Sequence, residues 1–86
     1  MTEASPSRLV IERVDKLSSR PWPLVTGRLE GKRLTVGQRV IIRQHDSVET
    51  PATIKGIELH TAPGMTTVAI DVPHEQIEIG SVLTAP

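Results

Sequence analysis

An alternation of apolar and polar residues from Val25 to Glu30, within positions 24–30, is the feature that most constrains the fold. This segment reads LVTGRLE, and every second residue is apolar or small. Side chains alternate between the two faces of a β-strand, so this period is typical of a strand with one buried and one solvent face. The expected inward residues are Val25, Gly27 and Leu29, and the expected outward residues are Thr26, Arg28 and Glu30.

A second strand is expected after a glycine-containing connection. Gly31-Lys32-Arg33 interrupts the alternation, and Val36, Val40 and Ile42 resume it. Glycine takes positive φ angles without a Cβ penalty, which suits a turn at this point. The pattern predicts two strands joined as a hairpin, with two cations projecting from the connection.

The C-terminal half of the chain predicts three further strands separated by loops and turns. A polar run over residues 43–51 is expected to be a loop, and proline and glycine mark the turns that follow. The expected strands cover residues 52–60, 68–72 and 77–83, and the expected turns lie at Pro63-Gly64 and residues 73–76.

The apolar period slips inside the strand expected over residues 52–60. Ile54 is followed by a second apolar pair, Ile57 and Leu59, which is out of phase with it. A β-bulge inserts one extra residue into a strand and corrects such a slip. We therefore expect a bulge at Lys55-Gly56 that places the three apolar residues on one face.

The apolar pattern predicts secondary structure least clearly in the N-terminal part of the chain. Residues 1–7 are polar and contain a proline, so we expect a disordered leader there. Residues 8–17, RLVIERVDKL, suit either a strand or a short amphipathic helix. We expect residues 8–86 to form one domain, because the chain is only 86 residues long.

Composition makes the expected core aliphatic. Trp22 is the only aromatic residue, and valine, isoleucine and leucine favour strands. The sequence therefore predicts an all-β fold. Its expected core comprises Val25, Leu29, Val40, Ile42, Ile54, Ile57, Val68, Ile70 and Leu83.

Several classes of function lack their sequence signals. The chain has no cysteine, and no apolar run approaches the roughly 20 residues that cross a bilayer. The N-terminus lacks the apolar segment of a secretory signal peptide. We expect a cytoplasmic protein that does not bind membranes.

Catalysis and cofactor binding are not expected either. No glycine-rich phosphate loop is present, so we expect no nucleotide and no other cofactor. The histidines, His45, His60 and His74, lie far apart in the sequence, without a serine or carboxylate at a recognisable catalytic spacing. We expect neither an enzyme nor a metal site.

Charge is distributed unevenly along the chain despite a net charge of zero. Up to Arg43 there are nine basic and four acidic residues, and from Gln44 onward there is one basic residue against six acidic ones. The strands of a barrel interleave, so this asymmetry leaves two alternatives open. The surface is either mixed, or it keeps a basic face and an acidic face.

The motifs, taken in order, resemble the second domain of elongation factor Tu and related translation GTPases. VTGR-x-E-G at residues 25–31 is followed by G-I-E-L-H at 56–60 and by I-E-x-G-x-V-L-x-x-P at 77–86. Ile11-Glu12-Arg13-Val14 resembles the first strand of that domain. The resemblance implies a small antiparallel Greek-key β-barrel, with residues 8–17 as a strand and without the GTPase domain.

The resemblance also supplies candidate RNA-binding positions. In the family this domain helps to hold the acceptor end of aminoacyl-tRNA, and the residue types of its pocket match at Glu12, Thr26, Glu58 and His60. Four other pocket positions carry different residue types, namely Arg13, Asp15, Thr61 and Asp71. The absence of a phosphate-contacting arginine at position 61 weakens the case for binding aminoacyl-tRNA in the family's manner.

Two functions of different classes follow. The first is a non-catalytic module that binds RNA or a ribonucleoprotein such as the ribosome, with Arg28, Lys32 and Arg33 as further phosphate contacts. The second is a protein-binding adaptor that docks through Pro21-Trp22-Pro23, with Trp22 and Arg20 as candidate contacts. Trp22 has a structural alternative as well, which is to plug one end of the barrel.

Overall fold

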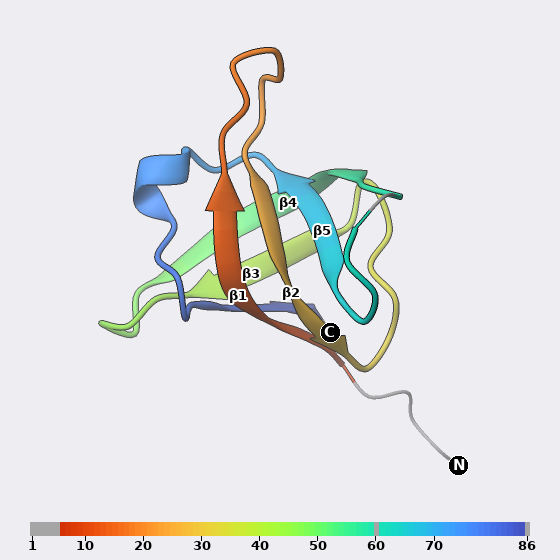
Figure 1. Cartoon of the computed structure of the whole chain (residues 1–86). Coiled ribbons are helices and arrows are strands. Elements are labelled where there is room, and N and C mark those ends of the chain that lie inside the picture. The colour runs from red at the N-terminus through yellow and green to blue at the C-terminus, as the bar shows by residue number, and fades with distance from the viewer. Residues whose placement is uncertain (1–5, 60, 86) are drawn as a thin grey trace.

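The computed structural model describes residues 6–59 and 61–85 as six β-strands and one short 3-10 helix. Figure 1 shows the strands wrapped around a common centre, with the connection between the first two projecting as a finger. The strands are β1 (Ser7–Asp15), β2 (Leu24–Glu30), β3 (Arg39–Arg43), β4 (Glu49–Ile57), β5 (Thr66–Ile70) and β6 (Val82–Ala85), and the 3-10 helix is η1 (His74–Gln76).

The strands form a closed antiparallel barrel in the order β1-β2-β5-β4-β3-β6. β6 completes it, because Leu83 pairs with Leu9 of β1 on one side and with Ile42 of β3 on the other. β3, β4 and β5 pair in succession and β6 returns beside β3, which is the Greek-key arrangement. The all-β barrel predicted from the sequence is confirmed.

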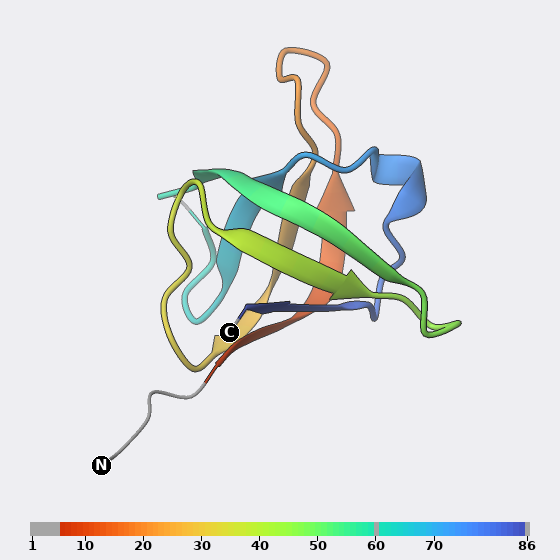
Figure 2. The same cartoon turned by 180° about the vertical axis from the view of Figure 1, so that it is seen from behind.

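The connection after β2 is not a hairpin, and that prediction is wrong. β2 pairs with β1 and β5, whereas β3 pairs with β4 and β6. Residues 31–38, called the crossover from here on, therefore pass from one side of the barrel to the other (Figure 2). Alternation reports which face of a strand is buried but not which strand is its neighbour. Val36 lies in the crossover and is exposed, not in the second strand.

The inner surface of the barrel is filled by aliphatic side chains, as expected. Seven of the nine predicted core residues are buried, and the other two, Leu29 and Ile57, are half-buried and pack against the same cluster. The core also includes residues that the prediction omitted, most of them near strand ends or in connections: Leu9, Ile11, Leu34, Ala52, Val72, Ile77 and Ala85.

Residues 8–17 do not form a helix, because β1 runs from Ser7 to Asp15 and contributes Leu9 and Ile11 to the core. Ser7 was expected to belong to the leader, but it is buried as the first residue of β1. Residues 1–5 of that leader lie outside the described residues. β1 has its own irregularity of register, between Ile11 and Arg13.

The bulge expected in β4 is present, because the register with β5 shifts between Ile54 and Gly56. Its consequence for side chains is only partly as predicted. Ile54 is buried and Ile57 half-buried, but Leu59 is 88% exposed because β4 ends at Ile57. Leu59 therefore does not belong to the inner face.

Other strand boundaries also differ from the prediction. β4 begins at Glu49, so the polar loop before it is shorter than residues 43–51. The last strand covers Val82–Ala85 alone, and buried Ile77 belongs to the connection that precedes it. Within residues 6–59 and 61–85, no helix has the length and apolar character needed to cross a bilayer.

Gly27 of β2 packs against β1 without room for a side chain, which gives a first testable prediction. A Cβ on Gly27 would overlap the carbonyl oxygen of Val10 and lie 2.8 Å from Leu9 Cδ2. Backbone atoms have little room to shift in a closed barrel, so Gly27→Ala should lower the free energy of unfolding by about 2 to 3 kcal/mol or more, as overpacked cores do. The midpoint of urea denaturation measures this change.

Gly56→Ala is the matched control for that substitution. Its Cβ would meet only the Ala69 Cβ, at 3.8 Å, an ordinary contact distance. We expect a change within about 0.5 kcal/mol for this variant. Equal midpoints for the two variants would contradict the close approach of β1 and β2.

Candidate binding surfaces

A hollow with a volume of about 450 Å³ lies beside Trp22. One wall comes from the base of the β1–β2 finger, where it joins the two strands, and the other comes from the connection between β5 and β6. Trp22 and Val72 provide apolar wall from these two segments, and Asp71 and Glu75 add carboxylates. This hollow, called the Trp22 groove, is lined by Lys16, Pro21, Trp22, Pro23, Asp71, Val72, Pro73, His74 and Glu75.

Trp22 is 38% exposed and is not part of the buried cluster inside the barrel. The ammonium of Lys55 lies 5.5 Å from the centre of its ring, which is within the range of a cation–π contact. The indole is thus held on the outside of the barrel. The prediction that Trp22 is partly exposed is confirmed, and the alternative in which it plugs the barrel end is not.

A second hollow, of about 270 Å³, gathers three threonine hydroxyls. Thr67 lies in the middle, with its Oγ1 2.8 Å from Thr26 Oγ1 and 2.9 Å from Thr61 Oγ1. This threonine hollow therefore contains Thr26 and Glu58, two of the residues that the family resemblance suggested for RNA binding. Its full lining is Arg13, Asp15, Leu24, Thr26, Glu58, Thr61, Ala62 and Thr67.

The charges around the threonine hollow are already paired. Arg13 Nε lies 2.8 Å from Asp15 Oδ2, and Arg20 Nη1 lies 2.7 Å from Glu58 Oε2. Arg20, a candidate for protein contact, therefore links the finger to the segment after β4 and does not line the Trp22 groove. His60, the fourth residue suggested by the family, lies outside the described residues.

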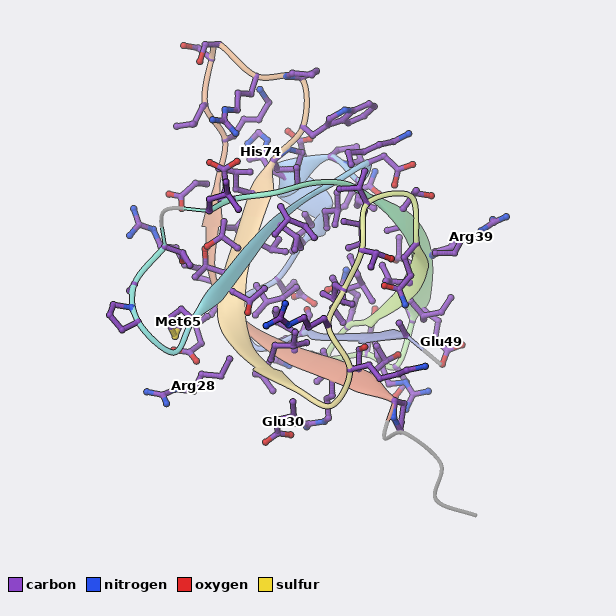
Figure 3. All side chains as sticks on the ribbon, turned by 90° about the vertical axis from the view of Figure 1, so that its right-hand side faces the viewer. Arg28, Glu30, Arg39, Glu49, Met65 and His74 are labelled. Carbon is purple, nitrogen blue, oxygen red and sulfur yellow. The ribbon has the colours of Figure 1, made fainter. Side chains whose placement is uncertain are left out.

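The crossover and the strand before it carry a different set of cations. Arg28 is exposed on β2, and Lys32 and Arg33 are exposed in the crossover. Figure 3 views the side on which the crossover lies, and Arg28 points outward there below Met65, with Arg39 on the opposite side of the view. Among the described residues, no carboxylate lies within ion-pair distance of these three.

The crossover is held in place by contacts at several points. Leu34 is buried in the core, and Ser7 Oγ donates a 2.7 Å hydrogen bond to the carbonyl of Lys32. Gly37 N–H donates to the carbonyl of Ile54, at 2.8 Å. The segment that carries Lys32 and Arg33 is thus anchored to β1, to β4 and to the core.

A hollow of about 290 Å³ lies beside Arg33. Leu29, Leu34 and Ile57 form its apolar walls, and Thr66 supplies a hydroxyl. Arg28 does not line this hollow, but it follows Gly27 on β2, and Gly27 pairs with Thr66 of the lining. One cation, Arg33, and three apolar side chains therefore line the same hollow.

No cluster of three or more histidine, cysteine, aspartate or glutamate residues occurs in the described part of the chain with the geometry to hold a metal ion. The expectation that the protein is not an enzyme stays a prediction.

Comparison of the sequence with models of known protein families gives no match, and the search of curated proteins gives none either. The structure therefore identifies an architecture and not a family: a small closed barrel of six antiparallel strands. The likeness to the second domain of elongation factor Tu remains a resemblance of motifs.

The sequence identified Trp22 but missed the opposite wall of its groove. Val72 and Glu75 are about 50 positions away in the chain, and their approach to Trp22 depends on the pairing of β2 with β5. The sequence did contain one similarity between the two walls. Pro73 follows the apolar Val72, just as prolines flank the apolar ring in Pro21-Trp22-Pro23. Pattern alone does not bring two such segments together.

The placement of Trp22 outside the core predicts a modest decrease in stability on truncation. Trp22→Ala should lower the free energy of unfolding by about 1 to 2 kcal/mol, because part of the ring is solvated and the variant has no ring for the Lys55 ammonium to face. Truncation of a fully buried aromatic residue costs about 3 to 5 kcal/mol. Urea denaturation of the variant measures the change in stability. Acrylamide quenching of the parent's tryptophan fluorescence measures how far the indole is exposed to solvent.

Ile70→Ala provides the comparison, because Ile70 is fully buried. The free energy of unfolding of that variant should fall by about 2 to 5 kcal/mol. A larger decrease for Trp22→Ala than for Ile70→Ala, together with an indole protected from acrylamide, would show that Trp22 is part of the core.

Proposed function

We propose that the protein is a non-catalytic RNA-binding module that holds the RNA backbone at the crossover. The observation that carries this proposal is that Arg28, Lys32 and Arg33 are exposed and unpaired among the described residues, on a segment that is anchored to the barrel. These three residues are called the crossover patch. Cations without carboxylate partners attract phosphates most strongly, because no ion pair has to be broken first.

Four of the other five arginines differ in this respect, whereas Arg39 is also exposed and has no carboxylate within ion-pair distance among the described residues. Arg8, Arg13, Arg20 and Arg43 each lie between 2.5 and 3.5 Å from a carboxylate oxygen. A phosphate would have to compete with that carboxylate for the same guanidinium group. This contrast favours the crossover patch over the threonine hollow, because Arg13 of its lining is paired with Asp15 and Glu58 of its lining is paired with Arg20.

The hollow beside Arg33 offers room for part of a nucleotide next to a bound phosphate. Its walls are aliphatic, so a base there would be held by apolar contact and by the Thr66 hydroxyl, without stacking on an aromatic ring. Aromatic stacking and base-edge hydrogen bonds supply much of the affinity and specificity of RNA-binding sheets. We therefore expect binding that depends weakly on base sequence.

The resemblance to a translation-factor domain supports RNA as the nucleic acid and translation as the setting. The motif matches cover most of the chain, and the barrel has the architecture that the resemblance implies. Binding of aminoacyl-tRNA is not part of the proposal, since paired charges occupy the threonine hollow.

The salt dependence of RNA binding tests this proposal. A labelled single-stranded RNA of about 12 nucleotides matches the site size of a small barrel. The double variant Lys32→Glu with Arg33→Glu should bind it more weakly at every salt concentration between about 50 and 200 mM. The slope of log affinity against log salt should flatten by about 0.7 for each phosphate that the variant no longer neutralises.

The matched control is Arg39→Glu with Lys55→Glu. These cations are exposed on β3 and β4, and their reversal changes the net charge by the same amount. The control should keep most of the parent's slope. An equal effect of both double variants would mean that net charge alone drives binding, and absence of binding by the parent at low salt would contradict the proposed function.

A further inference from the structure

The Trp22 groove is a second surface, separate from the crossover patch, and its chemistry differs. None of the residues that line the groove belongs to the crossover patch. Its volume of about 450 Å³ falls within the range of about 300 to 1,000 Å³ that is typical of ligand sites. The groove is therefore a second candidate site, with a volume large enough for a ligand.

The walls of the groove are flat, rigid and preformed. Three proline rings and one indole line it, and Val72 is buried behind them. The carbonyl of Pro23 accepts a 3.2 Å hydrogen bond from the N–H of Ile70, which ties one wall to β5. The carbonyl of Pro73 accepts a 2.9 Å hydrogen bond from the N–H of Gln76, which fixes the other wall. Grooves of ring-shaped side chains suit extended, proline-containing peptides.

Lys55 orients the indole without entering the groove. Its ammonium lies 5.5 Å from the ring centre, and Lys55 is not among the residues that line the hollow. The cation thus covers the ring from outside the groove. A ring held in this way gives up little side-chain entropy when a ligand packs against it.

The lining carries two carboxylates, Asp71 and Glu75, against one ammonium, that of Lys16. Asp71 accepts a 2.7 Å hydrogen bond from the N–H of Thr53 through Oδ1, which fixes its carboxylate and leaves Oδ2 available. Glu75 lies 3.8 Å from the imidazole of His74, a long contact at an exposed position. Lys16 is the cation of the lining, and its ammonium already donates to the carbonyls of Leu17 and Arg20, at 2.9 and 2.6 Å.

We propose that the Trp22 groove docks a basic, proline-containing segment of a partner protein in an extended conformation. A proline or aliphatic side chain packs against Trp22 and the groove prolines, and a lysine or arginine that follows it pairs with Glu75 and Asp71. Phosphate-bearing ligands are disfavoured by the same two carboxylates. The groove is thus a site for a cationic peptide, whereas the crossover patch attracts anions.

Trp22 is the only tryptophan, so a single indole N–H signal in the nuclear magnetic resonance spectrum reports on the groove. The probe is a synthetic peptide, Ala-Pro-Pro-Leu-Pro-Arg-Arg, added to the isotope-labelled protein. Its acidic twin carries two glutamates in place of the arginines. We expect a saturable shift of the indole signal with the basic peptide, and roughly tenfold or greater weakening with the acidic twin.

Glu75→Lys tests the rim without disturbing the core, because Glu75 is exposed in η1. This variant should weaken binding of the basic peptide roughly tenfold. Glu78→Lys is the matched control, since Glu78 is an exposed carboxylate three positions away and outside the groove lining. The control should bind as the parent does.

Four results would overturn the proposal. Equal binding of the two peptides, or no saturable indole shift with either, would remove the basic segment as occupant. An indole signal that moves with protein concentration alone would identify a second copy of this chain as the occupant. An indole shift caused by single-stranded RNA would assign the groove to nucleic acid. If the protein failed to bind RNA at all, peptide binding in the groove would be unaffected, so the two proposals can fail separately.

Discussion

The pairing of β6 with both β1 and β3 is the interaction on which the rest of the molecule depends. Leu83 is fully buried between Leu9 and Ile42, its partners in the two neighbouring strands. Closure removes the free strand edges within the described barrel, so any partner would have to bind through side chains and not by adding a strand. It also requires a long connection between β2 and β3, and this connection carries two of the cations of the crossover patch.

Closure also separates charges that lie close together in the sequence. The basic first half of the chain supplies β1, β2, the crossover and β3, and four of its arginines find carboxylate partners at strand positions or in loops. The crossover patch keeps its charge because its residues lie in and just before a connection. The acidic second half contributes Asp71 and Glu75 to the Trp22 groove. The two surfaces therefore differ in sign although the net charge is zero.

Much of the fold could be predicted from local patterns, because burial on one face of a strand leaves a period of two. That period correctly placed Val25 and Ile42 inside, and the slip at Lys55-Gly56 marked a real bulge. Residues 8–17 were ambiguous by pattern, and the resemblance resolved them as a strand. The neighbours of each strand could not be predicted, since pairing is a long-range property, and the hairpin expected after β2 failed for this reason. Only the Trp22 side of the groove could be predicted, because the residues of its two walls are distant in the sequence.

RNA binding at the crossover patch, and not at the paired charges of the threonine hollow, is the central claim. The most direct measurement maps backbone amide shifts of the isotope-labelled protein during titration with a single-stranded RNA of about 12 nucleotides. We expect the largest saturable shifts at Arg28, residues 31–36 and Thr66. Largest shifts at Thr26, Glu58 and Thr67, with little change in the crossover, would contradict the claim.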